Sequence, residues 1–322
     1  MNYRCAILDD YQNVALSIAD WTTLPDTVAV RAYSTHFTSE DELVAAIGDC
    51  EIVVIMRERT PFPRRLFARL PALKLLVTTG PRNLSIDLAA AALHGVTVCA
   101  TSTQGHATAE LTWGLILAAA RRMPLENAAL RTDGPWQTTL GTEIGGRQLG
   151  VIGLGKLGAR VAQIGQAFGM NVVAWSTNLT PERCAEVGVA HAGSLDALLA
   201  SSDVVTLHMV LSPRSQGMLG ARELGLMKPT AFLINTSRGP LVDEGALVAA
   251  LEAGAIAGAG RDVFDVEPLP AGHPLRRLPN VTATPHLGYV TEENYRTLYA
   301  GVVEDIVAWL AGNPLRVLSR PA

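Results

Sequence analysis

The stretch RQLGVIGLGKLGARVAQIGQAFGMNVVAWSTN, residues 147–178, decides the fold. It begins with a short apolar run at residues 149–152 and a glycine-rich turn. A helical pattern with one apolar face then runs from residue 156 to about residue 168, and a second apolar run follows at residues 172–175. A strand, a glycine turn, an amphipathic helix and a strand in this order predict a βαβ unit of a parallel sheet.

The glycines of this turn have the GxGxxG spacing of a dinucleotide-binding site. Gly153 allows the tight turn, Gly155 lets a pyrophosphate approach the backbone, and Gly158 lets the helix pack closely on the strand. The start of the helix then offers free N–H groups and a partial positive charge to the phosphates. A purely structural turn is the alternative. The flanking strands and helix favour the cofactor site, with Lys156 and Leu157 as further contacts.

The end of the second strand leaves the choice of cofactor open. An Asp or Glu usually holds the ribose 2′-hydroxyl of NAD about 20 residues after the first glycine. Here that position has Ser176 and Thr177, and the nearest Arg is Arg183. We therefore predict that Ser176 and Thr177 contact the cofactor, which is either NAD or NADP.

Composition excludes several classes of protein. The 322 residues are long enough for two domains, and 48% hydrophobic against 17% charged residues indicate a compact globular chain. A net charge of −4 argues against a nucleic-acid binder or an anionic-membrane binder, and residues 111–120 are too short to span a membrane. The polar N-terminus does not resemble a signal peptide, and four dispersed cysteines indicate free thiols in a reducing compartment, so we expect the cytoplasm. We expect no metal, because the histidines and cysteines lack ligand spacing.

The order of apolar runs predicts two α/β domains. Before residue 100, five short strand patterns alternate with helical patterns, which is typical of a parallel sheet covered by helices. A long helix over residues 107–123, ended by Pro124, is expected to cross into the second domain, and a final helix over residues 291–310 to return to the first. The predicted domains are residues 1–102 plus 290–322, and residues 103–289.

Three segments of the second domain place titratable residues directly after apolar strands, where an open α/β sheet binds its ligands. Arg238 precedes a Gly-Pro turn, and its guanidinium is suited to binding a carboxylate, with bonds to loop carbonyls as the structural alternative. Asp262 and Glu267 follow the next strand, and His286 the one after. A carboxylate beside a histidine fixes its tautomer and favours proton transfer to an alcohol oxygen, but spacing alone does not show that Glu267 and His286 meet.

Together these segments resemble the D-isomer-specific 2-hydroxyacid dehydrogenase family along essentially the whole chain. The matching stretches are GLGKLG at 153–158, LHMVLSPRS at 207–215, LINTSRGPLVDEGAL at 233–247, RDVFDVEP at 261–268 and TPHLGYVT at 284–291. The resemblance implies a flavodoxin-like substrate domain and a Rossmann dinucleotide-binding domain, both doubly wound parallel sheets, in a homodimer. It also implies an NAD(P)-dependent oxidoreductase that interconverts a 2-keto acid and a D-2-hydroxy acid by hydride transfer.

The resemblance also assigns roles to single residues. Arg238 would bind the substrate's carboxylate and carbonyl oxygen, His286 would be the acid/base, and Glu267 would orient it. Further cofactor contacts would come from His208, Thr236, Asp262 and Gly288. Besides the missing carboxylate at Ser176, two departures are visible. Gly260-Arg261 stands where small or apolar residues are usual, and the turn TTGPRN at 78–83 replaces a common Gly-x-Gly sequence.

The first domain carries the expected substrate contacts. The segment Arg57-Glu58-Arg59 looks like the basic turn of phosphoglycerate dehydrogenases, and the backbone N–H groups of Thr79 and Gly80 are candidates for holding a carboxylate. With Arg82, the arginines favour a small acidic or hydroxylated substrate such as hydroxypyruvate, glyoxylate or 3-phosphohydroxypyruvate. The alternatives are a dinucleotide-sensing interaction protein, as in the family's corepressor relatives, and a dehydrogenase of formate or phosphite.

Overall fold

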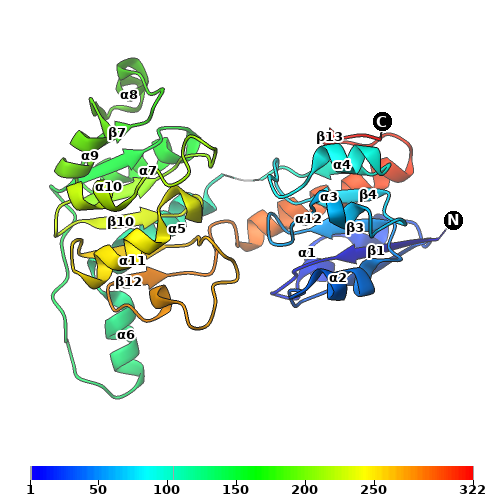
Figure 1. Ribbon diagram of the computed structural model, residues 1–322, viewed down its shortest axis with the longest axis horizontal. Coiled ribbons are helices and arrows are strands. Elements are labelled where there is room, and N and C mark those ends of the chain that lie inside the picture. The colour runs from blue at the N-terminus through cyan, green and yellow to red at the C-terminus, as the bar shows by residue number, and fades with distance from the viewer. Residues whose placement is uncertain (1, 104, 322) are drawn as a thin grey trace. The chain divides into compact units, whose positions relative to one another are not determined.

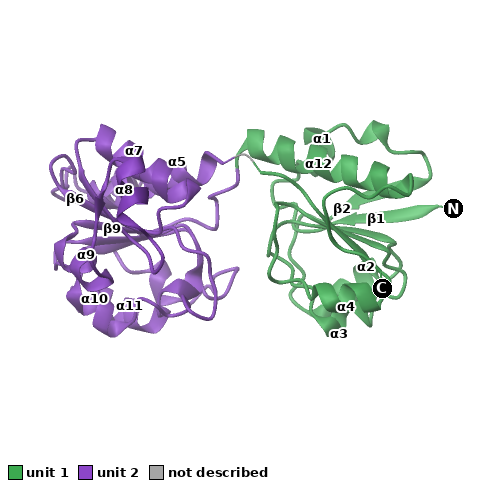
Figure 2. Cartoon of the chain, turned by 90° about the horizontal axis from the view of Figure 1, so that it is seen from above, with its two compact units in different colours: residues 1–104, 291–322 green, residues 105–290 purple. Residues whose placement is uncertain are grey.

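The computed structural model describes residues 2–103 and 105–321. The chain divides into two compact units, residues 1–104 with 291–322 and residues 105–290 (Figure 2). Among the described residues, no helix is both long and apolar enough to cross a membrane.

The first unit is built on a six-stranded sheet of order β13-β5-β4-β3-β1-β2. Its strands are β1 (Tyr3–Ile7), β2 (Val28–Ala32), β3 (Ile52–Ile55), β4 (Leu75–Thr78), β5 (Thr97–Ala100) and β13 (Val317–Ser319). All pairs are parallel except β13 with β5. Strands β2-β1-β3-β4-β5 therefore follow the flavodoxin-like order, whose ligand crevice lies at the carboxyl ends of β1 and β3.

Helices cover both faces of this sheet, as Figure 2 shows, with α1 and α12 on one face and α2, α3 and α4 on the other. Their bounds are α1 (Ala15–Ile18), α2 (Glu40–Ile47), α3 (Arg64–Phe67), α4 (Leu88–Leu93) and α12 (Glu292–Leu310), with a 3₁₀ turn η1 (Trp21–Thr23). Ser39 caps α2 by accepting a hydrogen bond from the N–H of Glu42.

The second unit is built on a seven-stranded parallel sheet of order β12-β11-β10-β9-β6-β7-β8 (Figure 1). Its strands are β6 (Gln148–Ile152), β7 (Asn171–Trp175), β8 (Ala190–His191), β9 (Val204–Leu207), β10 (Phe232–Asn235), β11 (Gly258–Arg261) and β12 (Val281–Ala283). The strand order reverses between β6 and β9. In such a Rossmann sheet the crevice for a dinucleotide lies at the carboxyl ends of those two strands.

Two apolar clusters fill the second unit, one on each face of its sheet. The first includes residues of α5 (Ala107–Ala120), α7 (Lys156–Ala167) and α8 (Pro181–Val187). The second includes residues of α9 (Leu195–Ser201), α10 (Ala221–Leu226) and α11 (Glu244–Glu252). Two 3₁₀ turns, η2 (Gly239–Leu241) and η3 (Pro274–Arg276), complete the unit. The predicted fold class, two doubly wound α/β sheets, is confirmed.

One helix prediction is wrong. The helix predicted over residues 107–123 ends at Ala120, Arg122 takes a left-handed conformation with φ 52°, and a separate helix α6 (Met123–Arg131) follows. Pro124 lies in the first turn of α6. Backbone N–H groups there have no partner within the helix, so a proline costs no helical hydrogen bond. The proline therefore begins a helix here instead of ending one.

Candidate active site

The glycine turn joins β6 to α7, and its geometry requires glycine at two positions. Gly153 has φ 98°, and a Cβ there would lie 2.6 Å from the carbonyl oxygen of His208. A Cβ on Gly158 would lie 1.9 Å from the carbonyl oxygen of Gly153. At Gly155 a Cβ would meet nothing within 4 Å, and no side chain caps the start of α7. The turn thus leaves open backbone at a helix N-terminus, which fits a pyrophosphate.

His208 follows β9 and lies against the same turn. Its Nε2 is 3.0 Å from Thr206 Oγ1, while its buried Nδ1 has no hydrogen-bond partner among the described residues. Burial lowers the pKa of His208 to about 3, so the ring is neutral near pH 7. This polar atom beside the glycine turn also fits a bound cofactor, while the neutral ring adds no positive charge.

The end of β7 carries no charge that would select between the two cofactors. Ser176 and Thr177 follow the strand, as the sequence predicts. Arg183 instead forms an ion pair with Glu186, with 2.9 Å between Nη1 and Oε2, within α8. The one arginine of α8 is therefore paired within its own helix.

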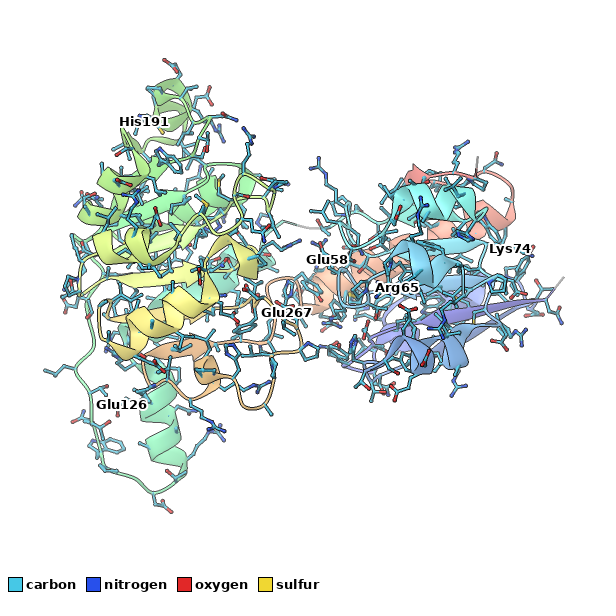
Figure 3. The ribbon with its side chains drawn as sticks, viewed as in Figure 1. Glu58, Arg65, Lys74, Glu126, His191 and Glu267 are labelled. Atoms are coloured by element: carbon cyan, nitrogen blue, oxygen red, sulfur yellow. The ribbon has the colours of Figure 1, made fainter. Side chains whose placement is uncertain are left out.

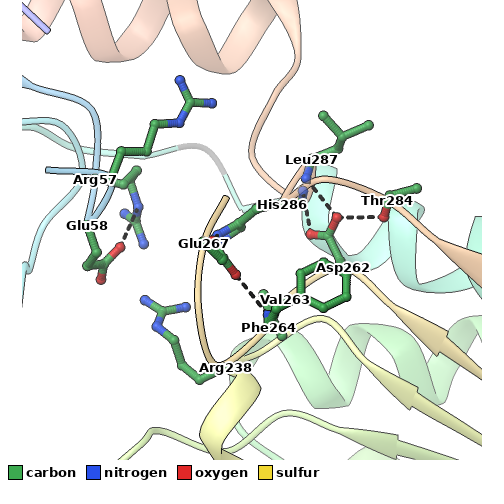
Figure 4. A network of polar contacts seen from close by, with 12 residues as sticks. Arg57, Glu58, Arg238, Asp262, Val263, Phe264, Glu267, Thr284, His286 and Leu287 are labelled. Carbon is green, nitrogen blue, oxygen red and sulfur yellow. Dashed lines mark hydrogen bonds and ion pairs between the residues drawn. The ribbon is translucent and has the colours of Figure 1, made fainter. Parts of the chain in front are cut away.

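The structure brings Glu267 and His286 together. Glu267 Oε2 lies 2.6 Å from His286 Nδ1, and Glu267 Oε1 accepts a 2.9 Å hydrogen bond from the N–H of Phe264 (Figure 4). His286 has φ 53°, and its ring meets that of Tyr289 edge-on, with 5.4 Å between centroids. With Nδ1 engaged by the carboxylate, Nε2 is the nitrogen left for a substrate.

The electrostatics of Glu267 favour its ionised form. Burial raises the pKa of the Glu267 carboxyl, but the hydrogen bond and charge of His286, the Phe264 N–H and the charge of Arg238 together outweigh burial and lower it. The carboxylate is therefore charged at neutral pH and able to stabilise a protonated imidazole.

The Asp262 carboxylate holds the segment that carries His286 in place through hydrogen bonds. Its Oδ1 accepts hydrogen bonds from Thr284 Oγ1 at 2.6 Å and from the N–H of Leu287 at 2.7 Å, and its Oδ2 accepts one from the N–H of Gly288 at 2.8 Å. Burial raises the pKa of Asp262 despite these donors. The Asp262 carbonyl also accepts from the N–H of His286 at 2.9 Å. Sequence reasoning placed Asp262 near the cofactor and missed this local role, together with its partner Thr284.

Arg238 begins the turn after β10. The Asn235 side chain donates to its carbonyl oxygen at 2.9 Å, and its own Nη1 donates to the Ser237 carbonyl at 2.7 Å. Its side chain lies near Glu267 in Figure 4, in keeping with its effect on that pKa. A Cβ on Gly239 would lie 2.2 Å from the Phe264 carbonyl carbon, so the Arg238 turn packs directly on the loop that holds Glu267.

Two more predicted cofactor contacts are held by neighbours on α5. Thr236 is buried, with its Oγ1 2.8 Å from Thr112 Oγ1. The carbonyl oxygen of Gly288 accepts a 2.7 Å hydrogen bond from Thr108 Oγ1. Helix α5 therefore holds both segments through hydrogen bonds from two of its threonines.

In the first unit, Arg57 and Thr79 are joined. Arg57 has φ 55°, and its N–H donates to Thr79 Oγ1 at 2.9 Å. Its guanidinium lies against Gly80, where a Cβ would be 1.9 Å from Nη1, and its Nε is 3.7 Å from Glu58 Oε2. Arg82 is exposed.

The predicted carboxylate turn does not have the free backbone that was expected. The N–H of Thr79 donates to the Ile55 carbonyl at 3.0 Å, and the N–H of Gly80 donates to Thr101 Oγ1 at 2.8 Å. Both N–H groups therefore already have acceptors at neighbouring strand ends, and contact of Thr79 and Gly80 with a substrate stays a prediction.

Arg59 also makes contacts within the first unit that the sequence does not predict. Its Nη1 donates to the Asp9 carbonyl at 2.7 Å, its Nη2 lies 3.4 Å from Tyr295 Oη, and its guanidinium lies 4.3 Å from the centre of the Tyr11 ring. It thus joins the carboxyl ends of β1 and β3.

Comparison with known proteins identifies the family. The sequence pattern described as "D-isomer specific 2-hydroxyacid dehydrogenase, NAD binding domain" matches residues 113–288, more than half of the chain. A glyoxylate reductase from Aeropyrum pernix is 39% identical over 258 residues, which cover 77% of this chain and 76% of that protein. The chain belongs to the D-isomer-specific 2-hydroxyacid dehydrogenase family.

Two further relatives match most of this chain. A D-3-phosphoglycerate dehydrogenase from Methanocaldococcus jannaschii is 37% identical over 277 residues, 85% of this chain but only 52% of that protein, so this chain spans about half its length. The crystal structure of a phosphoglycerate oxidoreductase from Vibrio cholerae superposes with a TM-score of 0.92 at 36% identity, covering 96% of this chain and 99% of the other. The expected class, an oxidoreductase with NAD(P) as cofactor, is thereby confirmed. Nothing in these comparisons supports the corepressor-like alternative.

Proposed function

We propose that this dehydrogenase reduces a small 2-keto acid to the D-2-hydroxy acid with His286 as the proton donor. The observation that carries the proposal is the 2.6 Å contact between His286 Nδ1 and Glu267 Oε2, with Arg238 beside it. A histidine held at one nitrogen by an ionised carboxylate presents its other nitrogen as a general acid near neutral pH.

The chain's own residues divide the work in this proposal. A bound nicotinamide supplies the hydride. Glu267 keeps the imidazole in one orientation, His286 Nε2 gives its proton to the carbonyl oxygen, and Arg238 binds the substrate's carboxylate through its planar guanidinium. The start of α7 and its glycine turn hold the pyrophosphate.

The substrate that we propose is small and acidic or hydroxylated: glyoxylate, hydroxypyruvate or 3-phosphohydroxypyruvate. Arg57 and Arg82 of the first unit supply positive charge for it, and the relatives above are named for glyoxylate reduction and phosphoglycerate oxidation. Arg59 adds less support than its sequence indicates, because its guanidinium already donates to Asp9 and Tyr295.

The test is a matrix of purified enzyme with NADH and NADPH against glyoxylate, hydroxypyruvate, 3-phosphohydroxypyruvate, pyruvate and longer apolar 2-keto acids. We expect turnover of at least one of the first three, at the highest kcat/KM in the matrix. Preference for a bulky apolar keto acid would overturn the substrate proposal, and turnover of none would overturn the reaction.

We further propose a homodimer in the cytoplasm. Helix α6 and the loop after it extend from the body of the second unit (Figure 1) and expose large apolar side chains: Met123, Leu130, Trp136 and Leu140. Glu126, labelled in Figure 3, ties the loop to the helix by accepting hydrogen bonds from Thr138 and Thr139. Such an ordered apolar arm fits a second copy of the chain.

The proposed location in the cytoplasm has a separate basis. Four buried free cysteines support a reducing compartment.

A further inference from the structure

Arg261 is a fully buried charge at the end of β11, directly before Asp262. Its side chain is 0% exposed. Charged residues are almost never fully buried unless they are paired. The ion pair available to it is long, with 3.5 Å between Nη2 and Glu244 Oε2, and its buried Nη1 has no partner among the described residues. Charge pairing alone therefore does not account for its position.

The main contact of this guanidinium is a single backbone carbonyl. Both Nε and Nη2 of Arg261 donate to the carbonyl oxygen of Val263, at 3.1 and 3.0 Å. That carbonyl belongs to the peptide group between Val263 and Phe264. The N–H of the same peptide group donates to Glu267 Oε1 at 2.9 Å, and Glu267 Oε2 meets His286 (Figure 4).

We propose that Arg261 is a positioning residue for the acid/base pair, acting on Glu267 through the Val263–Phe264 peptide group. This inference rests on the proposed function of His286. Two donors on one carbonyl fix the plane of the peptide, so the N–H on its other side keeps its direction toward the carboxylate. A cation at the oxygen also polarises the peptide and strengthens donation from its N–H, most of all where water is excluded.

The charges around Arg261 allow this role. Glu244, Asp265 and Glu267 are the acidic groups that act on the guanidinium, and burial is the main opposing effect, which lowers its pKa. Glu244 begins α11, accepts from the N–H of Asp265 at 3.4 Å, and pairs with His273 Nε2 at 3.1 Å. Glu267 itself faces His286 and Arg238. The network thus anchors the loop to the helix that follows the Arg238 turn.

A purely structural role for Arg261 makes a different prediction. A buried ion pair can often be replaced by apolar side chains with little loss of stability, and sometimes with a gain. Arg261→Met keeps the length of the side chain and removes the charge and the donors. If Arg261 only fills space, this variant folds and leaves the Glu267–His286 pair unchanged.

The experiment compares wild type, Arg261→Met and Arg261→Lys by two readouts. The first is the pH titration of the His286 imidazole by NMR on histidine-labelled protein, assigned with His286→Asn. The second is kcat and KM for keto-acid reduction against pH. We expect the His286 titration midpoint to change in Arg261→Met and to change less in Arg261→Lys. We expect kcat to fall roughly tenfold in Arg261→Met, the value of one hydrogen bond, with KM for the cofactor little changed.

Arg222→Met is the matched control, because Arg222 is an exposed arginine that pairs with Asp196 on the surface. It should match wild type in both readouts. An unchanged His286 titration in Arg261→Met overturns the inference, and Arg261→Lys decides in the same way if the Met variant does not fold. If wild type reduces no keto acid while the titration still moves, the proposed reaction fails and the positioning link stands.

Discussion

His286 shows how one residue combines three local conditions. A left-handed backbone, with φ 53°, turns the chain directly after Pro285, and the Asp262 carbonyl holds its N–H at 2.9 Å. The contact with Glu267 then fixes its ring. The first two conditions involve only the backbone and the third needs the imidazole, so substitution at this position removes the contact with Glu267 and tests chemistry more than folding.

The first prediction is that His286→Ala lowers keto-acid reduction by roughly 10²–10⁴-fold, the usual share of a general acid. Cofactor affinity, measured by quenching of protein fluorescence with NADH, should stay close to that of wild type. Arg238→Lys is the companion variant, and it should also lose activity because one ammonium cannot replace a two-pronged guanidinium. Wild-type kinetics in His286→Ala would remove this residue from the reaction.

The second prediction concerns Ser176, which follows β7 without a charge. Ser176→Asp places a carboxylate where a 2′-phosphate of NADP would lie, so repulsion should lower kcat/KM for NADPH at least tenfold relative to NADH. Ser176→Asn is the uncharged control. Equal effects of Asp and Asn on both cofactors would show that this position does not contact the ribose.

At the scale of elements, function depends on where parallel strands end. Strands β10, β11 and β12 are neighbours in the sheet, and Arg238, Glu267 and His286 each follow one of them. Parallel neighbours deliver their following loops to the same edge, which is why three segments separated in sequence reach one place. The first unit is assembled from two separate parts of the chain. Its last helix and strand, α12 and β13, follow the second unit in the sequence.

Asp305, a buried residue of α12, pairs with the partly exposed Arg316 in the turn between α12 and β13. Asp305 is 0% exposed and lies 3.0 Å from Arg316 Nη2, which also donates to the Gly301 carbonyl at 2.9 Å. Burial raises the pKa of Asp305 to about 6, although Arg316 opposes this. A carboxyl whose folded pKa is raised favours folding most below its unfolded pKa of 3.8, and this contribution is lost as pH rises through about 6.

The third prediction follows from that sign. Arg316→Met leaves Asp305 without its cation, which should cost roughly 3 kcal/mol of stability at pH 8 and less at pH 5, where Asp305 is protonated. Chemical unfolding of wild type and variant at both pH values measures the difference. Adding Asp305→Asn to Arg316→Met should recover stability at pH 8 and little at pH 5. A loss that is the same at both pH values contradicts this account.

At the scale of the whole molecule, the apolar arm formed by α6 and the loop after it carries the two most exposed large apolar side chains among the described residues. Leu140 is 97% exposed and Trp136 78%, both on the loop after α6. Large exposed apolar side chains mark an interaction site where they form one patch. The proposal of a homodimer therefore concerns the arm and not the sheets.

The fourth prediction is that Trp136→Glu with Leu140→Glu converts the dimer to a monomer at micromolar concentration, because the charges cannot be buried in an apolar interface. Sedimentation velocity measures the mass directly. Leu93→Glu, at another exposed leucine on α4, is the control and should stay dimeric. A wild-type chain that sediments as a monomer contradicts the proposal.

The sequence by itself determined the class of fold and the family. Local signals were enough for this, since the spacing of Gly153, Gly155 and Gly158, the alternation of strands with helices, and the Ser39 cap depend on neighbours a few residues away. The helix end predicted at Pro124 was wrong because the sequence alone does not distinguish a proline that ends one helix from a proline that begins the next.

Only the tertiary structure decided the contacts between distant segments. It joined Glu267 to His286, engaged the N–H groups of Thr79 and Gly80 with other strands, and buried Arg261 beneath the peptide that holds Glu267. Sequence carries no direct record of which hydrogen-bonding groups are already satisfied, because the partners of Thr79, Gly80 and His286 come from other strand ends. Whether a polar group is free for a ligand is therefore a property of the folded sheet.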